Sequence, residues 1–88
     1  MKITEQEFME LYGEEKVSFS NYYKYRFHFS GTTKEGYSIY MTWGGNADDI
    51  YKFNVESSDV FQLNSYRGWH SGIVRDKDGK EIHWFEEE

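Results

Sequence analysis

The sequence predicts an α+β domain in which one N-terminal helix packs on a twisted antiparallel sheet, or a small roll or barrel, of five to six short strands. Helical spacing of apolar residues occurs only near the N-terminus. From residue 23 onward, apolar and polar residues alternate with a period of two, as in half-buried strands. No helical segment separates those strands, which disfavours a parallel sheet. At 88 residues the chain is expected to form a single domain.

The pattern places the helix at residues 4–12. Thr4 and Glu7 have the spacing of a capping box, in which each side chain bonds the backbone amide of the other residue. Gly13 follows the last apolar position of the helical face. We expect it to end the helix in a left-handed conformation.

The rest of the chain is expected to form strands joined by turns. The clearest hairpin signal is Asp78-Gly79, a pair that favours a tight turn with positive φ. The expected strands are residues 23–30, 37–43, 50–55, 60–65, 73–76 and 80–85, with a short strand or bridge at 17–19. The acidic tail 86–88 is expected to be frayed.

Aromatic residues dominate the apolar composition. The chain has 8 Tyr, 7 Phe and 3 Trp, more rings than a core of this size is expected to hold. Some rings should therefore lie on the surface, where Tyr and Trp are effective binding anchors.

Charge and cysteine content narrow the classes of function. The formal net charge of −6 disfavours non-specific binding to nucleic acid or to an anionic membrane, and it suits a basic protein partner. The chain has no cysteine, which excludes disulfides, thiolate metal sites and thiol nucleophiles.

The stretch S-Y-R-G-W-H-S-G, residues 65–72, is the first candidate site. In one interpretation it forms an anion or nucleotide pocket in which Arg67 pairs with a phosphate and Trp69 stacks on a base. In a second, Tyr66, Arg67, Trp69 and His70 form a protein-binding hot spot. In a third, the stretch is a connection between strands, with Trp69 folded into the core.

A second candidate is the basic row Lys24, Arg26 and His28 on one face of the strand 23–30. A phosphate could bridge this row and Arg67 only if the two segments are neighbours. Simple alternation puts the rings of this strand on the opposite face from the row. Because a stacking platform needs both on one face, the pattern disfavours RNA binding.

A third candidate is the acidic stripe Glu7, Glu10 and Glu14 along the predicted helix. No lysine or arginine stands beside these carboxylates in the helix to neutralise them. Rows of carboxylates can imitate the phosphates of DNA, and the alternative is an ordinary solvated helix face.

Histidines supply a weaker catalytic hypothesis. His28, His70 and His83 are the residue type for metal-independent acid–base catalysis, but nothing in their spacing brings them together. The chain has no paired histidine spacing and no complete calcium loop, so we expect no metal and no cofactor.

In size, acidity and lack of cysteine, the chain resembles the small inhibitors carried by phages and mobile elements, including anti-CRISPR proteins. The resemblance implies a non-enzymatic cytoplasmic inhibitor, acting inside the host cell if it is phage-encoded. Its partner would be a basic or nucleic-acid-binding protein. The alternatives are a module that binds or sequesters a nucleotide or other phosphate anion and, third, a small acid–base enzyme. A homodimer paired through an aromatic sheet edge is a further possibility.

Overall fold

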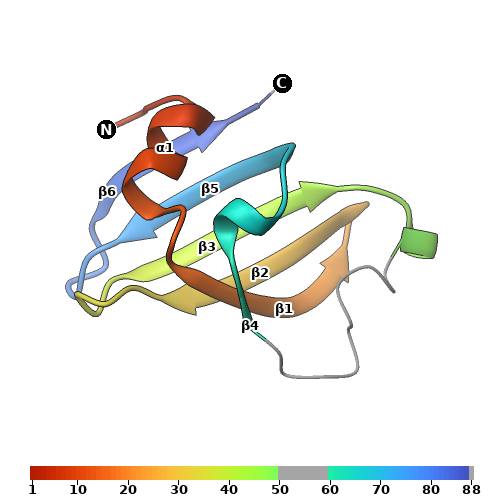
Figure 1. Ribbon diagram of the computed structural model, residues 1–88. Helices are drawn as coiled ribbons and strands as arrows, with labels where there is room; N and C mark the ends of the chain where they lie inside the picture. The colour runs from red at the N-terminus through yellow and green to blue at the C-terminus, as the bar shows by residue number, and fades with distance from the viewer. Residues whose placement is uncertain (50–59, 88) are drawn as a thin grey trace.

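The computed structural model describes residues 1–49 and 60–87 (Figure 1). One helix is followed by strands that form an open antiparallel sheet with the order β4-β1-β2-β3-β5-β6. The elements are α1 (Glu5–Tyr12), β1 (Lys16–Tyr23), β2 (Arg26–Thr32), β3 (Ser38–Gly44), β4 (Val60–Gln62), the 3₁₀ helix η2 (Leu63–Ser65), β5 (Trp69–Arg75) and β6 (Glu81–Glu86). The predicted α+β class is confirmed, as an open sheet and not a closed barrel.

Helix α1 begins as the sequence predicts. Thr4 Oγ1 accepts from the amide of Glu7 at 3.0 Å, and Glu7 Oε1 accepts from the amide of Thr4 at 3.0 Å. The prediction of a left-handed Gly13 is wrong, because this residue has φ −59° and ψ −27°. Its amide donates to Met9 O at 2.8 Å, and an added Cβ would lie 2.4 Å from that oxygen. Close approach to the helix, not positive φ, explains this glycine.

The predicted strand 23–30 is divided by a turn. β1 ends at Tyr23, Lys24 and Tyr25 reverse the chain with φ 52° and 63°, and β2 begins at Arg26. A two-residue connection with positive φ at both positions is the pattern of a type I′ turn. The turn places Tyr23 opposite Arg26, so the expectation that this ring shares a face with Phe27 is wrong.

Other element boundaries also differ from the prediction. The short strand expected at 17–19 is part of β1, the strand expected at 60–65 ends at Gln62, and β5 begins at Trp69. Glu86 is the last residue of β6, and the amide of Glu87 donates to His70 O at 2.7 Å, so the tail is paired as far as Glu87. The strand expected at 50–55 lies outside the described residues.

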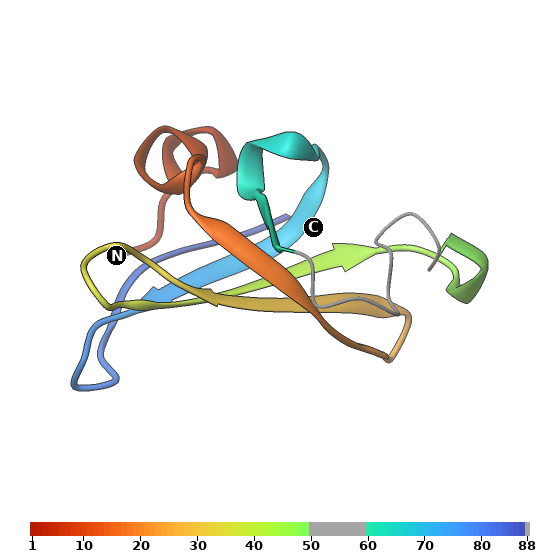
Figure 2. The ribbon, with the colours of Figure 1, turned by 60° about the horizontal axis from the view of Figure 1, so that its bottom comes forward.

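The core lies on one face of the sheet. α1 and η2 sit on this inner face, and no described element covers the opposite, outer face (Figure 2). The buried apolar side chains are Phe8, Val17, Phe27, Phe29, Ile39, Met41, Leu63, Trp69, Val74 and Phe85. Cross-strand partners share a face, so register places Tyr23, Arg26, His28, Tyr40, Thr42, Ser71, Ile73 and Trp84 on the outer face.

The N-terminal residues run beside the edge strand β6. Lys2 forms a parallel bridge with Trp84, the amide of Ile3 donates to Trp84 O at 2.8 Å, and the amide of Trp84 donates to Met1 O at 3.1 Å. These bonds occupy backbone groups that an edge strand otherwise exposes. Within the described residues, no helix has the length and apolar character needed to cross a membrane.

Loss of the capping box should destabilise the domain. We expect Thr4→Ala to lower the free energy of unfolding by about 1 kcal/mol, because the amide of Glu7 loses its acceptor. Thr4→Ser should restore most of that loss, since it keeps the hydroxyl. Urea denaturation of the three proteins measures the difference, and equal stability of Thr4→Ala and the parent would contradict the assignment.

Relief of the left-handed backbone at Tyr25 should stabilise the domain. We expect Tyr25→Gly to raise the free energy of unfolding by roughly 0.5–1 kcal/mol, because relief of left-handed strain exceeds the added entropy of the unfolded chain. Tyr23→Gly, two residues earlier inside β1, should lower it instead. A destabilised Tyr25→Gly protein in the same urea assay would show that the exposed ring contributes more than the strain costs.

Candidate functional site

Trp69 is a core residue, as the third interpretation of residues 65–72 expects. It is 1% exposed, its ring packs edge-on against Phe29 at 5.1 Å, and its Nε1 donates to Leu63 O at 3.1 Å. The ring is therefore not accessible to stack on a ligand in this structure.

The first half of the same stretch lines a depression of about 560 Å³ beside α1. Tyr66, Arg67 and Gly68 form one wall, and the start of α1 forms the other with Glu5, Gln6 and Met9. The side chain of Arg67 is exposed, and its carbonyl accepts from Trp43 Nε1 at 3.0 Å. This bond attaches the Arg67 loop to the end of β3.

Glu5 is an unfavourably placed carboxylate in this wall. Burial raises the pKa of Glu5, the hydrogen bond from the Trp69 amide to Oε2 (2.9 Å) lowers it, and the charge of Glu87 raises it, with a net upward shift. Glu5, which joins α1 to β5 through this bond, therefore lowers the stability of the fold when its carboxyl group is ionised.

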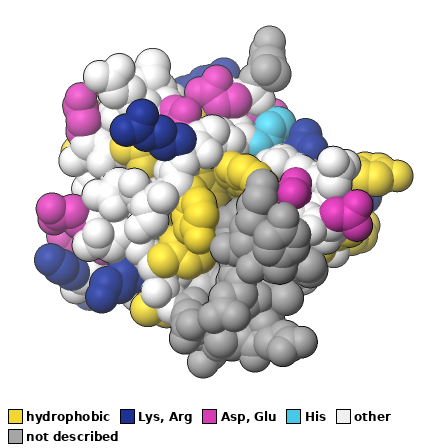
Figure 3. All heavy atoms as spheres, turned by 45° about the vertical axis from the view of Figure 1, so that its right-hand side comes forward, with side chains coloured by type: hydrophobic (Ala, Val, Ile, Leu, Met, Phe, Trp, Pro, Cys, Tyr) yellow, Lys and Arg dark blue, Asp and Glu magenta, His cyan; other side chains and the backbone are white. Residues whose placement is uncertain are grey.

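The structure brings Arg26 and His70 together across β3. A guanidinium nitrogen of Arg26 lies 3.4 Å from His70 Nε2, so the basic row and the second half of residues 65–72 are neighbours. In Figure 3 a histidine is visible at the surface beside a basic side chain. Gly44 stands opposite Arg26 in β3, and an added Cβ there would lie 3.8 Å from the guanidinium. The Arg26 side chain therefore lies over Gly44 on its way to β5.

Lys24 is separated from the predicted basic row because it lies in the β1–β2 turn. Its Nζ is 5.3 Å from the centroid of the Tyr23 ring. His28 remains on the outer face beside Arg26, where its Nδ1 is 2.5 Å from Tyr40 Oη and its Nε2 is 3.1 Å from Tyr23 O. Arg26 and His28 are thus the members of the row that share a strand face.

Carboxylates are segregated from most of the sheet. Strands β1 to β5 contain no aspartate or glutamate, and the acidic residues of β6 are Glu81 and Glu86. In a chain with 16 acidic residues, the outer face of β1, β2, β3 and β5 is therefore neutral to basic.

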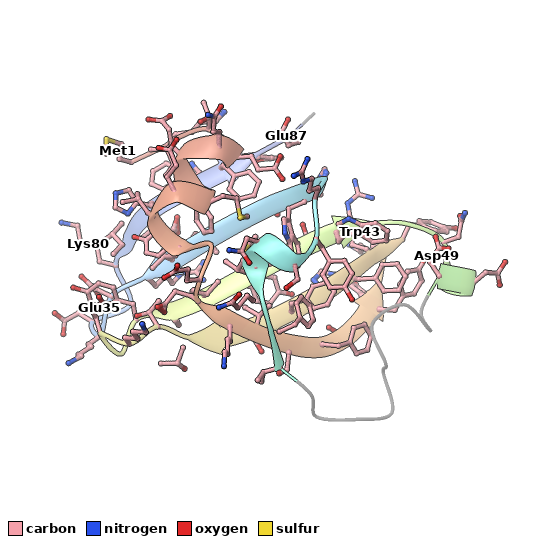
Figure 4. All side chains as sticks on the ribbon, viewed as in Figure 1. Met1, Glu35, Trp43, Asp49, Lys80 and Glu87 are labelled. Atoms are coloured by element: carbon pink, nitrogen blue, oxygen red, sulfur yellow. The ribbon has the colours of Figure 1, made fainter. Side chains whose placement is uncertain are left out.

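An acidic hollow of about 360 Å³ lies at the other end of the molecule. Figure 4 shows Glu35 at the end of the sheet opposite Trp43 and Asp49. The lining residues are Leu11, Tyr12, Glu15, Glu35 and Tyr37. The last turn of α1, which ends here, contains no basic residue. We name this feature the acidic hollow.

The predicted acidic stripe continues from the hollow along α1. Glu7 and Glu10 are exposed on the helix, and Glu14 is exposed just after its end. No salt bridge to a described residue neutralises these three carboxylates. Sequence analysis missed Glu35, because only the fold brings the β2–β3 turn against the end of α1.

The three histidines do not form one site. His83 lies on the inner side of β6, where its Nδ1 is 2.5 Å from Tyr12 Oη. His70 contacts Arg26 instead, so the two histidines have different partners. Burial, followed by the charge of Glu35, raises the pKa of Tyr12. Among residues 1–49 and 60–87, no group of three histidine or acidic side chains has the arrangement of a metal site.

The chain shows no significant similarity to any protein-family model, curated protein or solved structure. The local geometry of the acidic hollow and of the outer face therefore carries the functional argument.

The raised pKa of Glu5 predicts a pH effect with a defined sign. The folded protein binds this proton more tightly than the unfolded chain, so Glu5 makes stability fall as pH rises through the interval above its unfolded pKa. We expect Glu5→Gln, whose amide oxygen can still accept from Trp69, to gain stability relative to the parent between pH 4 and pH 7.

Urea denaturation at both pH values measures this difference. Glu87→Gln should reproduce part of the effect by removing the repelling charge. A Glu5→Gln protein whose relative stability falls toward pH 7 would contradict the assignment.

Proposed function

We propose that this protein is a non-enzymatic binding domain that docks on a basic protein through the acidic hollow and occludes its charged surface. The observation that carries the proposal is the hollow itself, an acidic concavity with aromatic walls and an exposed leucine at its rim. Leu11 is 57% exposed although it is one of only two leucines in the chain.

The hollow has the chemistry to hold a lysine or arginine side chain. Leu11 and the rings of Tyr12 and Tyr37 can contact the aliphatic stem, and Glu15 and Glu35 can pair with the charged head. Glu15 Oε2 accepts from the Lys34 amide at 3.0 Å, which orients its carboxylate. The carbonyl end of α1 adds negative partial charge at the same place.

Lysine side chains lie close to the hollow, and Lys77 is among them, beside Gly36 in the β2–β3 turn. Lys16 and Lys34 line an adjoining depression of about 270 Å³ with Glu14 and Glu15, but no salt bridge between these side chains forms in the described structure. Together with Glu7 and Glu10, the hollow gives α1 an extended acidic surface. Such a surface suits a partner that normally binds nucleic acid, which supports inhibition by charge mimicry.

Titration with short lysine- and arginine-rich peptides, followed by NMR, tests the proposal. We expect shifts at Leu11, Glu15, Glu35 and Tyr37, and at least about tenfold weaker binding for Glu35→Lys, because reversing one member of a shielded charge pair is costly.

Asp48→Lys is the matched control. It makes the same change of charge next to Asp49, which Figure 4 shows at the opposite end of the sheet, so it should weaken peptide binding far less. Equal weakening by both variants would show that binding depends only on net charge and would overturn the hollow as the site. The same pair of variants then separates specific from non-specific partners in affinity capture.

A further inference from the structure

The outer face carries a gap in its side-chain layer above Gly44. This residue lies between Arg26 on β2 and the start of β5, and it presents backbone only. Arg26 crosses the gap to His70 Nε2 at 3.4 Å. A guanidinium can only donate, so the His70 nitrogen is the acceptor in this contact. Two polar side chains thus converge over exposed backbone.

Within residues 1–49 and 60–87, the charge of Arg26 has no carboxylate counter-charge in a salt bridge. No described carboxylate pairs with it, whereas Arg75 on the same sheet lies 3.7 Å from Glu81. A planar guanidinium without a carboxylate can bind two oxygens of a phosphate at once. Glu86 is opposite Ser71, and the Glu87 amide bonds His70 O, so acidic residues border the gap on the β6 side. The rest of a ligand whose phosphate is bound by Arg26 would therefore extend toward β1, away from these acidic residues.

Aromatic rings stand on that side of the gap. Tyr23 is directly opposite Arg26 and 56% exposed. The ring of His28 lies 6.3 Å from that of Tyr23 and 5.6 Å from that of Tyr40. The β1–β2 turn moved Tyr23 onto the face of Arg26, so rings and cations share one face. This removes the objection that alternation raised against stacking.

The β1–β2 turn that follows Tyr23 has two residues with side chains in a backbone conformation that favours glycine or asparagine. Lys24 and Tyr25 both have positive φ, where Asn-Gly would be unstrained, and Tyr25 is 76% exposed. Strain of this kind at an exposed position is associated with function. Here it holds the Lys24 ammonium 5.3 Å from the centroid of the Tyr23 ring.

From these observations we infer that the outer face binds a nucleotide unit, with its phosphate on the Arg26 guanidinium over Gly44, beside His70, and its base on the Tyr23 ring. The unit can belong to a free nucleotide or to a single-stranded nucleic acid. The surface is distinct from the acidic hollow, so the inference stands independently of the proposed function.

Titration of the full chain with inorganic phosphate, AMP and a short single-stranded oligonucleotide at low salt, followed by NMR, tests the inference. We expect AMP to shift the amides of Tyr23, Arg26, Gly44 and His70. Arg26→Ala should weaken AMP at least about tenfold, the loss expected for a charged group left without its partner. Arg75→Ala is the matched control on the same sheet and should leave AMP binding unchanged.

Two further variants test the same site without removing Arg26, in case Arg26→Ala disturbs folding. Gly44→Ala fills the gap with a methyl group that has only ordinary contacts, and it should weaken phosphate and AMP alike. Tyr23→Ala should weaken AMP but not inorganic phosphate. Glu35→Lys should not weaken either ligand, which separates this site from the acidic hollow.

The two sources of the nucleotide unit are distinguished by affinity. An oligonucleotide that binds more tightly than AMP supports a single strand, and equal affinities support a free nucleotide. No binding of AMP or oligonucleotide at millimolar concentration overturns the inference. Equal losses in Arg26→Ala and Arg75→Ala, or AMP binding that Tyr23→Ala leaves unchanged, also overturn it.

Discussion

Burial of the Trp69 ring is the interaction on which the rest of the structure depends. The ring packs against Phe29 of β2 and stacks with Phe61 of β4, and its Nε1 bonds the carbonyl of Leu63 in η2. Its backbone amide bonds Glu5 at the start of α1. One residue thus connects two strands of the sheet with α1 and η2. α1 and η2 enclose this ring on the inner face, and no described element lies on the outer face.

The distribution of charge follows from the same one-sided arrangement. Glu15, which follows α1, and Glu35 of the β2–β3 turn lie together at one end of the molecule, where the helix ends in carbonyl groups. Strands β1 to β5 hold none, so the open face keeps Arg26, His28 and His70 without acidic neighbours on those strands. A chain with a net charge of −6 therefore has an acidic surface at one end and a sheet face that carries no carboxylate on strands β1 to β5. Net charge alone describes neither surface.

Local signals in the sequence were sufficient for the fold class and the start of α1. The capping box needs only Thr4 and Glu7, so its geometry can be predicted without the rest of the chain. The turn at Lys24-Tyr25 could not be predicted, because neither residue is a usual turn former and apolar alternation runs through it. Without that turn, alternation assigns Tyr23 to the same face as Phe27, whereas the structure has it on the outer face with Arg26. The Arg26–His70 contact and the acidic hollow also depend on tertiary structure, since each joins segments far apart in the sequence.

The bridge between Lys2 and Trp84 has a consequence for self-association. A sheet edge recruits another chain by offering unpaired amides and carbonyls. Here the amide of Trp84 donates to Met1 O and its carbonyl accepts from the amide of Ile3. A second copy could therefore pair with Trp84 only if residues 1–3 dissociate from β6. Residues 1–3 thus block this edge of the sheet, and edge-to-edge association through β6 requires their release.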